Sequence, residues 1–179
     1  MREFFQRPWV LPSALLVFLV ALITVGLLRS GHDAPEQIEY YWPESPMVIS
    51  CIGSPYDRED VDGAVKYWEE LGYDFFAVLY DFDCSSNFIS GAITISSADQ
   101  GFLIDNEDGL GFARIFSNEE TKEIQGVEIQ ILVNRERVLE HEIGHALRWE
   151  HFNQAGHIMH EEHGQGGWDS FGLRYVPEE

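Results

Sequence analysis

Three histidines and a glutamate constrain the fold of this 179-residue chain more than any other feature. They are His141, Glu142, His145 and His151. Residues four apart share one face of a helix, so His141 and His145 can direct their ring nitrogens at a single metal ion. A continuing helix would carry His151 about 9 Å further along the axis and turn it away from that face. The sequence therefore predicts a helix that ends between His145 and His151.

The residue types in this pattern predict a particular chemistry. Three neutral imidazoles with an open fourth position are typical of a catalytic zinc site, whereas structural zinc sites are closed. Glu142 lies at the edge of the histidine face, where its carboxylate can act as a general base without binding the metal. The same residues also occur on solvated surface helices, but here the polar face is flanked by apolar side chains, as in a buried helix: Leu139, Ile143, Ala146 and Leu147.

The run from His141 to His151 resembles the metzincin signature H-E-x-x-H-x-x-G-x-x-H. Met159, in Gly-His-Ile-Met-His, resembles the Met-turn of that family, and its eight-residue distance from His151 is similar to that of the matrixin branch. The resemblance implies a zinc endopeptidase in which His141, His145 and His151 hold one Zn²⁺. Glu142 would then assist the attack of zinc-bound water on a peptide bond. It also implies that Met159 forms an apolar floor under the three rings.

One residue departs from the family pattern. Arg148 stands where metzincins have the glycine that lets the chain turn sharply out of the helix. A non-glycine residue at positive φ costs about 1 kcal/mol, which is small beside a zinc-binding free energy of about 10 kcal/mol. His151 is still the expected third ligand. The rival third ligands are His157, His160, His163, Glu161 and Glu162.

The resemblance and the hydrophobic patterning together predict an α+β fold of zincin type within residues 47–179. This fold has a mixed five-stranded sheet, two main helices and a short C-terminal subdomain. Strands are expected at residues 47–52, 75–80, 92–96, 112–116 and 127–133, and helices at 60–71 and 135–147. Residues 110–116 also resemble the matrixin edge strand, which binds an extended peptide by adding it to the sheet.

The N-terminal part of the chain predicts a membrane anchor. Residues 10–28 carry no charge and are mostly apolar, about the length needed to cross a bilayer as one transmembrane helix. Arg2 and Arg7 precede this span and acidic residues follow it, which favours a cytoplasmic N-terminus at residues 1–9 and an extracytoplasmic catalytic domain. A cleaved signal peptide, which would leave a secreted domain, is the alternative. Residues 29–46, with three prolines, read as a linker.

Net charge and cysteine content limit which partners and which compartment are compatible with the chain. The net charge of −20 makes nucleic acid a poor partner, which leaves a protein or peptide substrate and leaves the oligomeric state open. Both Cys51 and Cys84 could form a disulfide in an oxidising compartment, or remain free thiols. An acidic cluster is either a solvated turn or a Ca²⁺-binding loop, although its spacing does not match an EF-hand: Asp99, Asp105, Glu107 and Asp108.

Two other functions are compatible with these residues. A membrane-tethered, non-catalytic zincin domain could bind peptides or partner proteins with zinc in a structural role. That role would require a fourth protein ligand, for which His157 and His160 are the candidates. A hydrolase with the same site could also act on a non-peptide amide.

Overall fold

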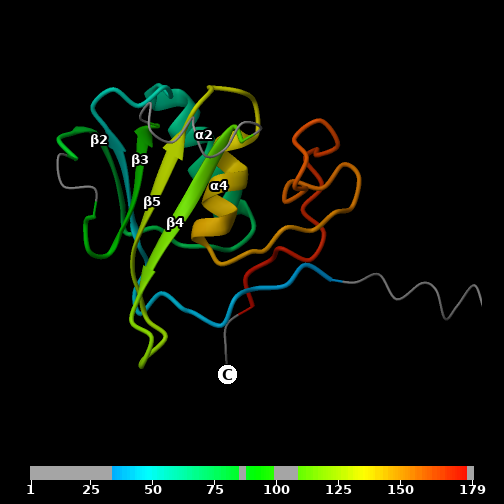
Figure 1. Cartoon of the computed structure of the whole chain (residues 1–179), viewed down its shortest axis with the longest axis horizontal. Helices are drawn as coiled ribbons and strands as arrows, with labels where there is room; N and C mark the ends of the chain where they lie inside the picture. The colour runs from blue at the N-terminus through cyan, green and yellow to red at the C-terminus, as the bar shows by residue number, and fades with distance from the viewer. Residues whose placement is uncertain (1–33, 85–87, 99–108, 177–179) are drawn as a thin grey trace, which may run out of the picture. The chain divides into compact units, whose positions relative to one another are not determined.

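The computed structural model describes residues 34–84, 88–98 and 109–176 of the chain. The elements are, in chain order, β1 (Met47–Cys51), α2 (Arg58–Glu70), β2 (Ala77–Phe82), β3 (Ala92–Ser97), β4 (Gly111–Ser117), β5 (Ile124–Ile131) and α4 (Val138–Ala146). The expected α+β architecture, with a mixed five-stranded sheet and two helices, is present (Figure 1).

The sheet has the strand order β2-β1-β3-β5-β4. Neighbouring strands are parallel from β2 to β5, and β4 alone runs antiparallel to its neighbour β5. The helix α2 forms the crossover between the parallel strands β1 and β2, as a parallel connection requires. This order places β4 at one edge of the sheet, beside the strand that leads into α4.

Both helices cover the same face of the sheet. Ile93 and Ile95 of β3 are in register with Val127 and Ile129 of β5, so all four side chains lie on one face. They belong to a single buried cluster that also contains the apolar side chains of α2 and α4. The alternate residues on the opposite face of β3 and β5 are polar: Thr94, Ser96, Glu128 and Gln130.

Local sequence explains where α2 begins and ends. Asp57 accepts a hydrogen bond from the Asp60 N–H and Asp60 accepts one from the Asp57 N–H, which makes a capping box at the first turn. Its apolar residues repeat at helical spacing and are buried: Val61, Ala64, Val65 and Trp68. Gly72, at φ +98°, ends the helix by adopting a left-handed conformation. Trp68 is a core residue, and its indole N–H donates to the Glu140 carbonyl.

Some boundaries differ from those that the sequence predicts. The helix α4 begins at Val138 instead of residue 135, because Arg137 has φ +72° and a right-handed helix cannot include that conformation. The strand β5 begins at Ile124, three residues earlier than predicted, because its first residues pair with the end of β4. The strand β2 begins and ends two residues later than predicted.

Other expectations concern the ends of the chain and its loops. The cytoplasmic segment 1–9, the transmembrane span 10–28 and the acidic cluster around residues 99–108 lie outside the described residues. Within the described ranges, no helix has the length and apolar character needed to cross a bilayer. Part of the expected linker 29–46 is bound to the folded domain, because residues 36–42 form hydrogen bonds with the end of α4. Cys51 and Cys84, for which the sequence allowed either a disulfide or free thiols, form a disulfide.

Candidate metal centre

The end of α4 turns the chain back toward its own histidines. His141 and His145 lie one turn apart on α4, and the helix ends at Ala146. The Arg148 N–H donates to the His145 carbonyl and the Trp149 N–H to the Gly144 carbonyl, which is the hydrogen-bond pattern of a Schellman motif. Arg148 takes the left-handed position of this motif, with φ +82°. The predicted helix break and the predicted positive φ are both present.

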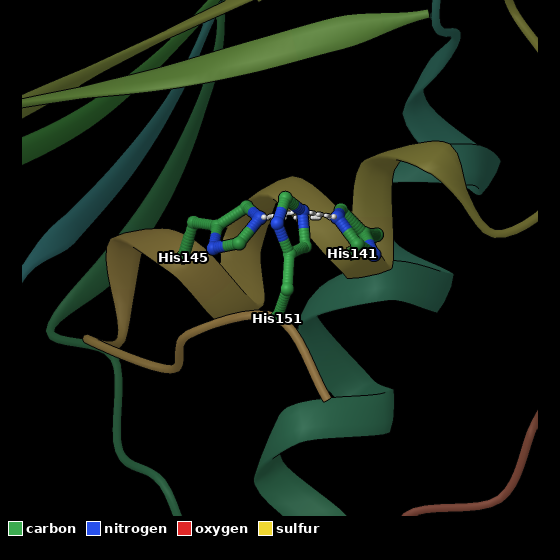
Figure 2. A group of neighbouring side chains, drawn as sticks. All are labelled: His141, His145 and His151. Carbon is green, nitrogen blue, oxygen red and sulfur yellow. Dashed lines mark hydrogen bonds between the residues drawn. The ribbon is translucent and has the colours of Figure 1, made fainter. Parts of the chain in front are cut away.

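The break brings the three histidines together. The Nε2 atoms of His141 and His145 lie 3.0 Å apart, and those of His145 and His151 lie 3.1 Å apart. The third side of the triangle, from His141 to His151, measures 3.3 Å. Figure 2 shows the three rings converging, with dashed lines between these nitrogens. In a tetrahedral zinc site with bonds of about 2.0–2.1 Å, ligand nitrogens lie about 3.3 Å apart. The triangle therefore has the size of a metal site.

The protonation of two rings indicates what the triangle can bind. The His141 Nδ1 lies 2.8 Å from the Ile158 carbonyl, and the His145 Nδ1 lies 2.7 Å from the Trp149 carbonyl. A carbonyl only accepts, so each Nδ1 carries the proton and each neutral ring leaves an unprotonated Nε2. Two such nitrogens cannot hydrogen-bond to each other at 3.0 Å. A cation between them satisfies both lone pairs, and carbonyls that orient ligating histidines in this way are common around metals.

Burial keeps the rings neutral. It lowers the pKa of His141 to about 4 and that of His145 to about 3. Burial also lowers the pKa of His151, although the nearby Glu161 carboxylate acts in the opposite direction. Because a histidine must be neutral to bind a metal, these shifts favour metal binding at neutral pH.

Glu142, the candidate general base, follows His141 on α4. Its carboxylate is buried, and the Oε2 atom has no hydrogen-bond partner. Burial raises the pKa of Glu142 to about 8. The carboxylate faces the start of β4, where a Cβ added to Gly111 would lie 3.1 Å from the Glu142 Oε1. A buried carboxylate with a raised pKa is a feature of catalytic acids and bases.

No family model, no curated protein and no solved structure matches this chain. The assignment of the site therefore depends on its own residues and their geometry.

Met159 is fully buried and packs against Gly144 of α4. A Cβ added to Gly144 would overlap the Met159 Sδ atom and would lie 2.8 Å from the Trp68 Cζ2. Only a glycine at position 144 allows this close approach. The residue before the methionine, Ile158, supplies the carbonyl that orients His141. The Met159 turn and α4 are thus packed against each other.

None of the rival third ligands belongs to the group of described residues that could hold a metal ion together with His141 and His145, and each has a hydrogen bond elsewhere. The His157 Nδ1 accepts a hydrogen bond from the Met159 N–H, and its Nε2 lies 3.0 Å from the Phe171 carbonyl. The His163 Nε2 lies 2.8 Å from the Glu136 carbonyl. The His160 Nδ1 accepts from the Glu162 N–H. The carboxylates of Glu161 and Glu162 accept from Asn153 and Gln165.

Several residues of the site were not anticipated from the sequence. The carbonyls of Trp149 and Ile158 orient two of the rings, Gly144 admits Met159, and His157 fixes the turn that carries Met159. Backbone carbonyls have no sequence signal. The glycine inside an apolar helix pattern was the one signal that could have revealed a close packing contact.

Proposed function

We propose that the chain is a zinc-dependent endopeptidase of the metzincin type, similar to the matrixin branch. One observation carries the proposal: three imidazole nitrogens converge on one point, and the helix that supplies two of them also carries a buried glutamate whose Oε2 has no hydrogen-bond partner. Imidazoles suit zinc, and the nitrogen spacing fits its tetrahedral geometry. His141, His145 and His151 would hold the ion. When bound, zinc polarises a carbonyl oxygen and lowers the pKa of water toward 7.

Glu142 is the proposed general base. Its Oε2 accepts a proton from the attacking water and then delivers it to the leaving nitrogen of the peptide. Burial raises the pKa of Glu142, so the carboxyl group holds a proton well enough to carry it between the two steps. A cation beside it acts in the opposite direction and favours the carboxylate at the start of the reaction. The lone Oε2 is available because no other group occupies it.

The edge strand β4 is the proposed peptide-binding element. It lies at the end of the strand order, so its outer side is not paired with another named strand of the described chain. An extended peptide can add to such an edge through backbone hydrogen bonds. The first residue of β4, Gly111, lies against the Glu142 carboxylate. A peptide bound along β4 would therefore run past the general base.

The geometry favours a catalytic over a purely structural ion. A closed structural site needs a fourth protein ligand. Both ring nitrogens of His157 already bond to backbone groups, and the His160 Nδ1 does so as well. Only the three histidines form a ligand group among the described residues. A metal ion held by the three histidines would therefore have a position open for water and substrate.

We also propose that the domain works on the extracytoplasmic side of a membrane, anchored by residues 10–28. The disulfide between Cys51 and Cys84 supports this location, because such bonds persist in oxidising compartments and are rare in the cytosol.

The decisive experiment uses the full chain in detergent micelles. We expect roughly one zinc per chain and cleavage of a mixed peptide library. Glu142→Gln should retain the metal and lose at least about 100-fold in kcat/KM, since general acid–base catalysis contributes 10²–10⁴-fold. The matched control is Glu140→Gln, the same change on the same helix, which should cleave like the wild type.

Each alternative predicts a different result. Zinc binding without peptide cleavage by either protein would favour the non-catalytic zincin domain or the hydrolase of a non-peptide amide. Cleavage by Glu142→Gln at the wild-type rate would remove Glu142 from the mechanism. A chain that takes up no zinc would contradict the whole proposal.

A further inference from the structure

Residues 36–42, here named the strap, are bound to the chain segment that leaves α4. The Ile38 N–H donates to the Arg148 carbonyl, and the Glu150 N–H donates to the Glu36 carbonyl, each at 3.0 Å. The strap also donates to two carbonyls at the helix end. The Trp42 indole N–H bonds the Ala146 carbonyl at 2.9 Å, and the Gln37 side-chain amide bonds the Leu147 carbonyl at 3.3 Å. Figure 1 shows the strap passing below the end of α4.

Arg148 closes this contact from the other side. Its Nη1 donates to the Tyr40 carbonyl at 2.7 Å, and its Nη2 donates to the Gln37 Oε1 at 3.1 Å. The Gln37 amide therefore bridges Arg148 and Leu147, accepting from one and donating to the other. Hydrogen bonds from a charged guanidinium are roughly twice as strong as neutral ones. The strap is therefore held to the end of α4 by both backbone and side-chain hydrogen bonds.

The backbone hydrogen bonds of the strap flank Trp149, which contacts the ring of His145. The strap bonds residues 148 and 150, and between them is Trp149, whose carbonyl orients the His145 ring. The next residue after Glu150 is His151. Arg148 itself is held at φ +82°, a conformation that a non-glycine residue does not keep unless its surroundings enforce it.

We propose that Arg148 and the strap are positioning elements of the metal site. They hold the exit of α4 in the conformation that delivers His151 and orients His145. This inference rests on the proposed function only in assuming that the three histidines bind a metal. A glycine at position 148 would allow the turn through its conformational freedom, whereas Arg148 holds the turn by tethering it to the strap.

The test is cobalt binding to the full chain in detergent micelles, measured in competition with a chelator after removal of metal with EDTA. Arg148→Ala and Gln37→Ala should each weaken cobalt affinity by about tenfold or more, since partners that orient ligands typically contribute 10–100-fold. Arg148→Lys keeps one donor and should recover part of the loss. The visible spectrum at saturating cobalt reports the coordination number, and it should change in both alanine variants.

The matched control is Arg58→Ala, which removes an arginine that stacks on Tyr80 at the other helix. Its cobalt affinity should lie within twofold of the wild type. If Arg148→Ala and Gln37→Ala both bound cobalt with wild-type affinity and spectrum, the strap would have no role in positioning. If both variants bound cobalt weakly but the wild type cleaved no peptide, the positioning role of the strap would be supported and the proposed endopeptidase activity would be contradicted. A wild-type chain that took up no cobalt would contradict the metal site and the strap together.

Discussion

At the scale of single residues, Gly144 is where the two helices and the Met159 turn meet. Gly144→Ala adds a methyl group that meets the Met159 sulfur and the Trp68 ring. Overpacking of this kind costs about 1–3 kcal/mol. We expect a lower free energy of unfolding in urea. Zinc should also bind more weakly, because the displaced turn carries the Ile158 carbonyl that orients His141.

The control for this change is Gly63→Ala on α2, where an added Cβ meets nothing within 4 Å. Because alanine is the better helix former by about 1 kcal/mol, this variant should gain stability and keep its zinc affinity. If Gly144→Ala behaved like Gly63→Ala, the Met159 contact would be unimportant for both stability and metal binding.

The clustering of the three candidate ligand histidines could be predicted from the sequence, whereas the groups that orient their rings could not. The spacing of His141 and His145 fixes their common helix face through local geometry alone. The position of His151 required only that the helix end before it. The hydrogen bonds from the His141 and His145 rings go to backbone carbonyls, which every residue possesses. Nothing in the sequence distinguishes the carbonyls of Ile158 and Trp149 from others until the chain is folded.

At the scale of elements, α2 supports α4 through Trp68, whose indole N–H donates to the Glu140 carbonyl. The capping box at the start of α2 should therefore stabilise the whole domain. Asp57→Ala removes the side chain that accepts from the Asp60 N–H and should lower the free energy of unfolding by about 1 kcal/mol. Chemical denaturation with the metal removed measures this change. Lys66→Ala, which breaks an exposed pair with Glu70, should change stability by less than about 0.5 kcal/mol.

Elements whose limits depend on local interactions were predicted more accurately than those whose limits depend on residues distant in the sequence. The first strand and α2 were placed within two residues, because their limits depend on local apolar runs and caps. The start of β5 was misplaced, since it depends on pairing with β4 and with Tyr41 of the strap. Docking of the strap could not be anticipated either. The three prolines and the acidic residues of segment 29–46 indicate a linker, and the partners of the strap are mostly backbone groups and the Arg148 side chain, which are brought to it only by folding.

At the scale of the whole molecule, the disulfide joins β1 to the segment after β2, at the opposite edge of the sheet from β4. It closes a separation of 33 residues, for which the loss of chain entropy in the unfolded state is worth about 2–4 kcal/mol. Replacing both Cys51 and Cys84 with serine should lower the free energy of unfolding by that amount. Zinc affinity should stay within twofold. Thiol alkylation before and after reduction, read by mass, tests whether the bond forms at all.

The response of the metal-free protein to acid should depend on His157, which links the Met159 turn to Phe171 far along the chain. Burial lowers the pKa of His157, while Asp169 raises it and His160 lowers it further. The unfolded chain therefore binds a proton at a higher pH than the folded one. Stability is complete above the unfolded value of about 6.5 and is lost as the pH falls below it.

His157→Gln keeps a donor and an acceptor without a titrating ring, so it should lose less stability than the wild type between pH 7.5 and 5.5. Urea denaturation in EDTA measures both slopes. Acid also relieves the repulsion within this strongly acidic chain, which stabilises both proteins in the same way. The difference between the slopes therefore reports His157 alone. Equal slopes would mean that His157 takes up its proton as readily in the folded protein as in the unfolded one, and that the Met159 turn tolerates the charge.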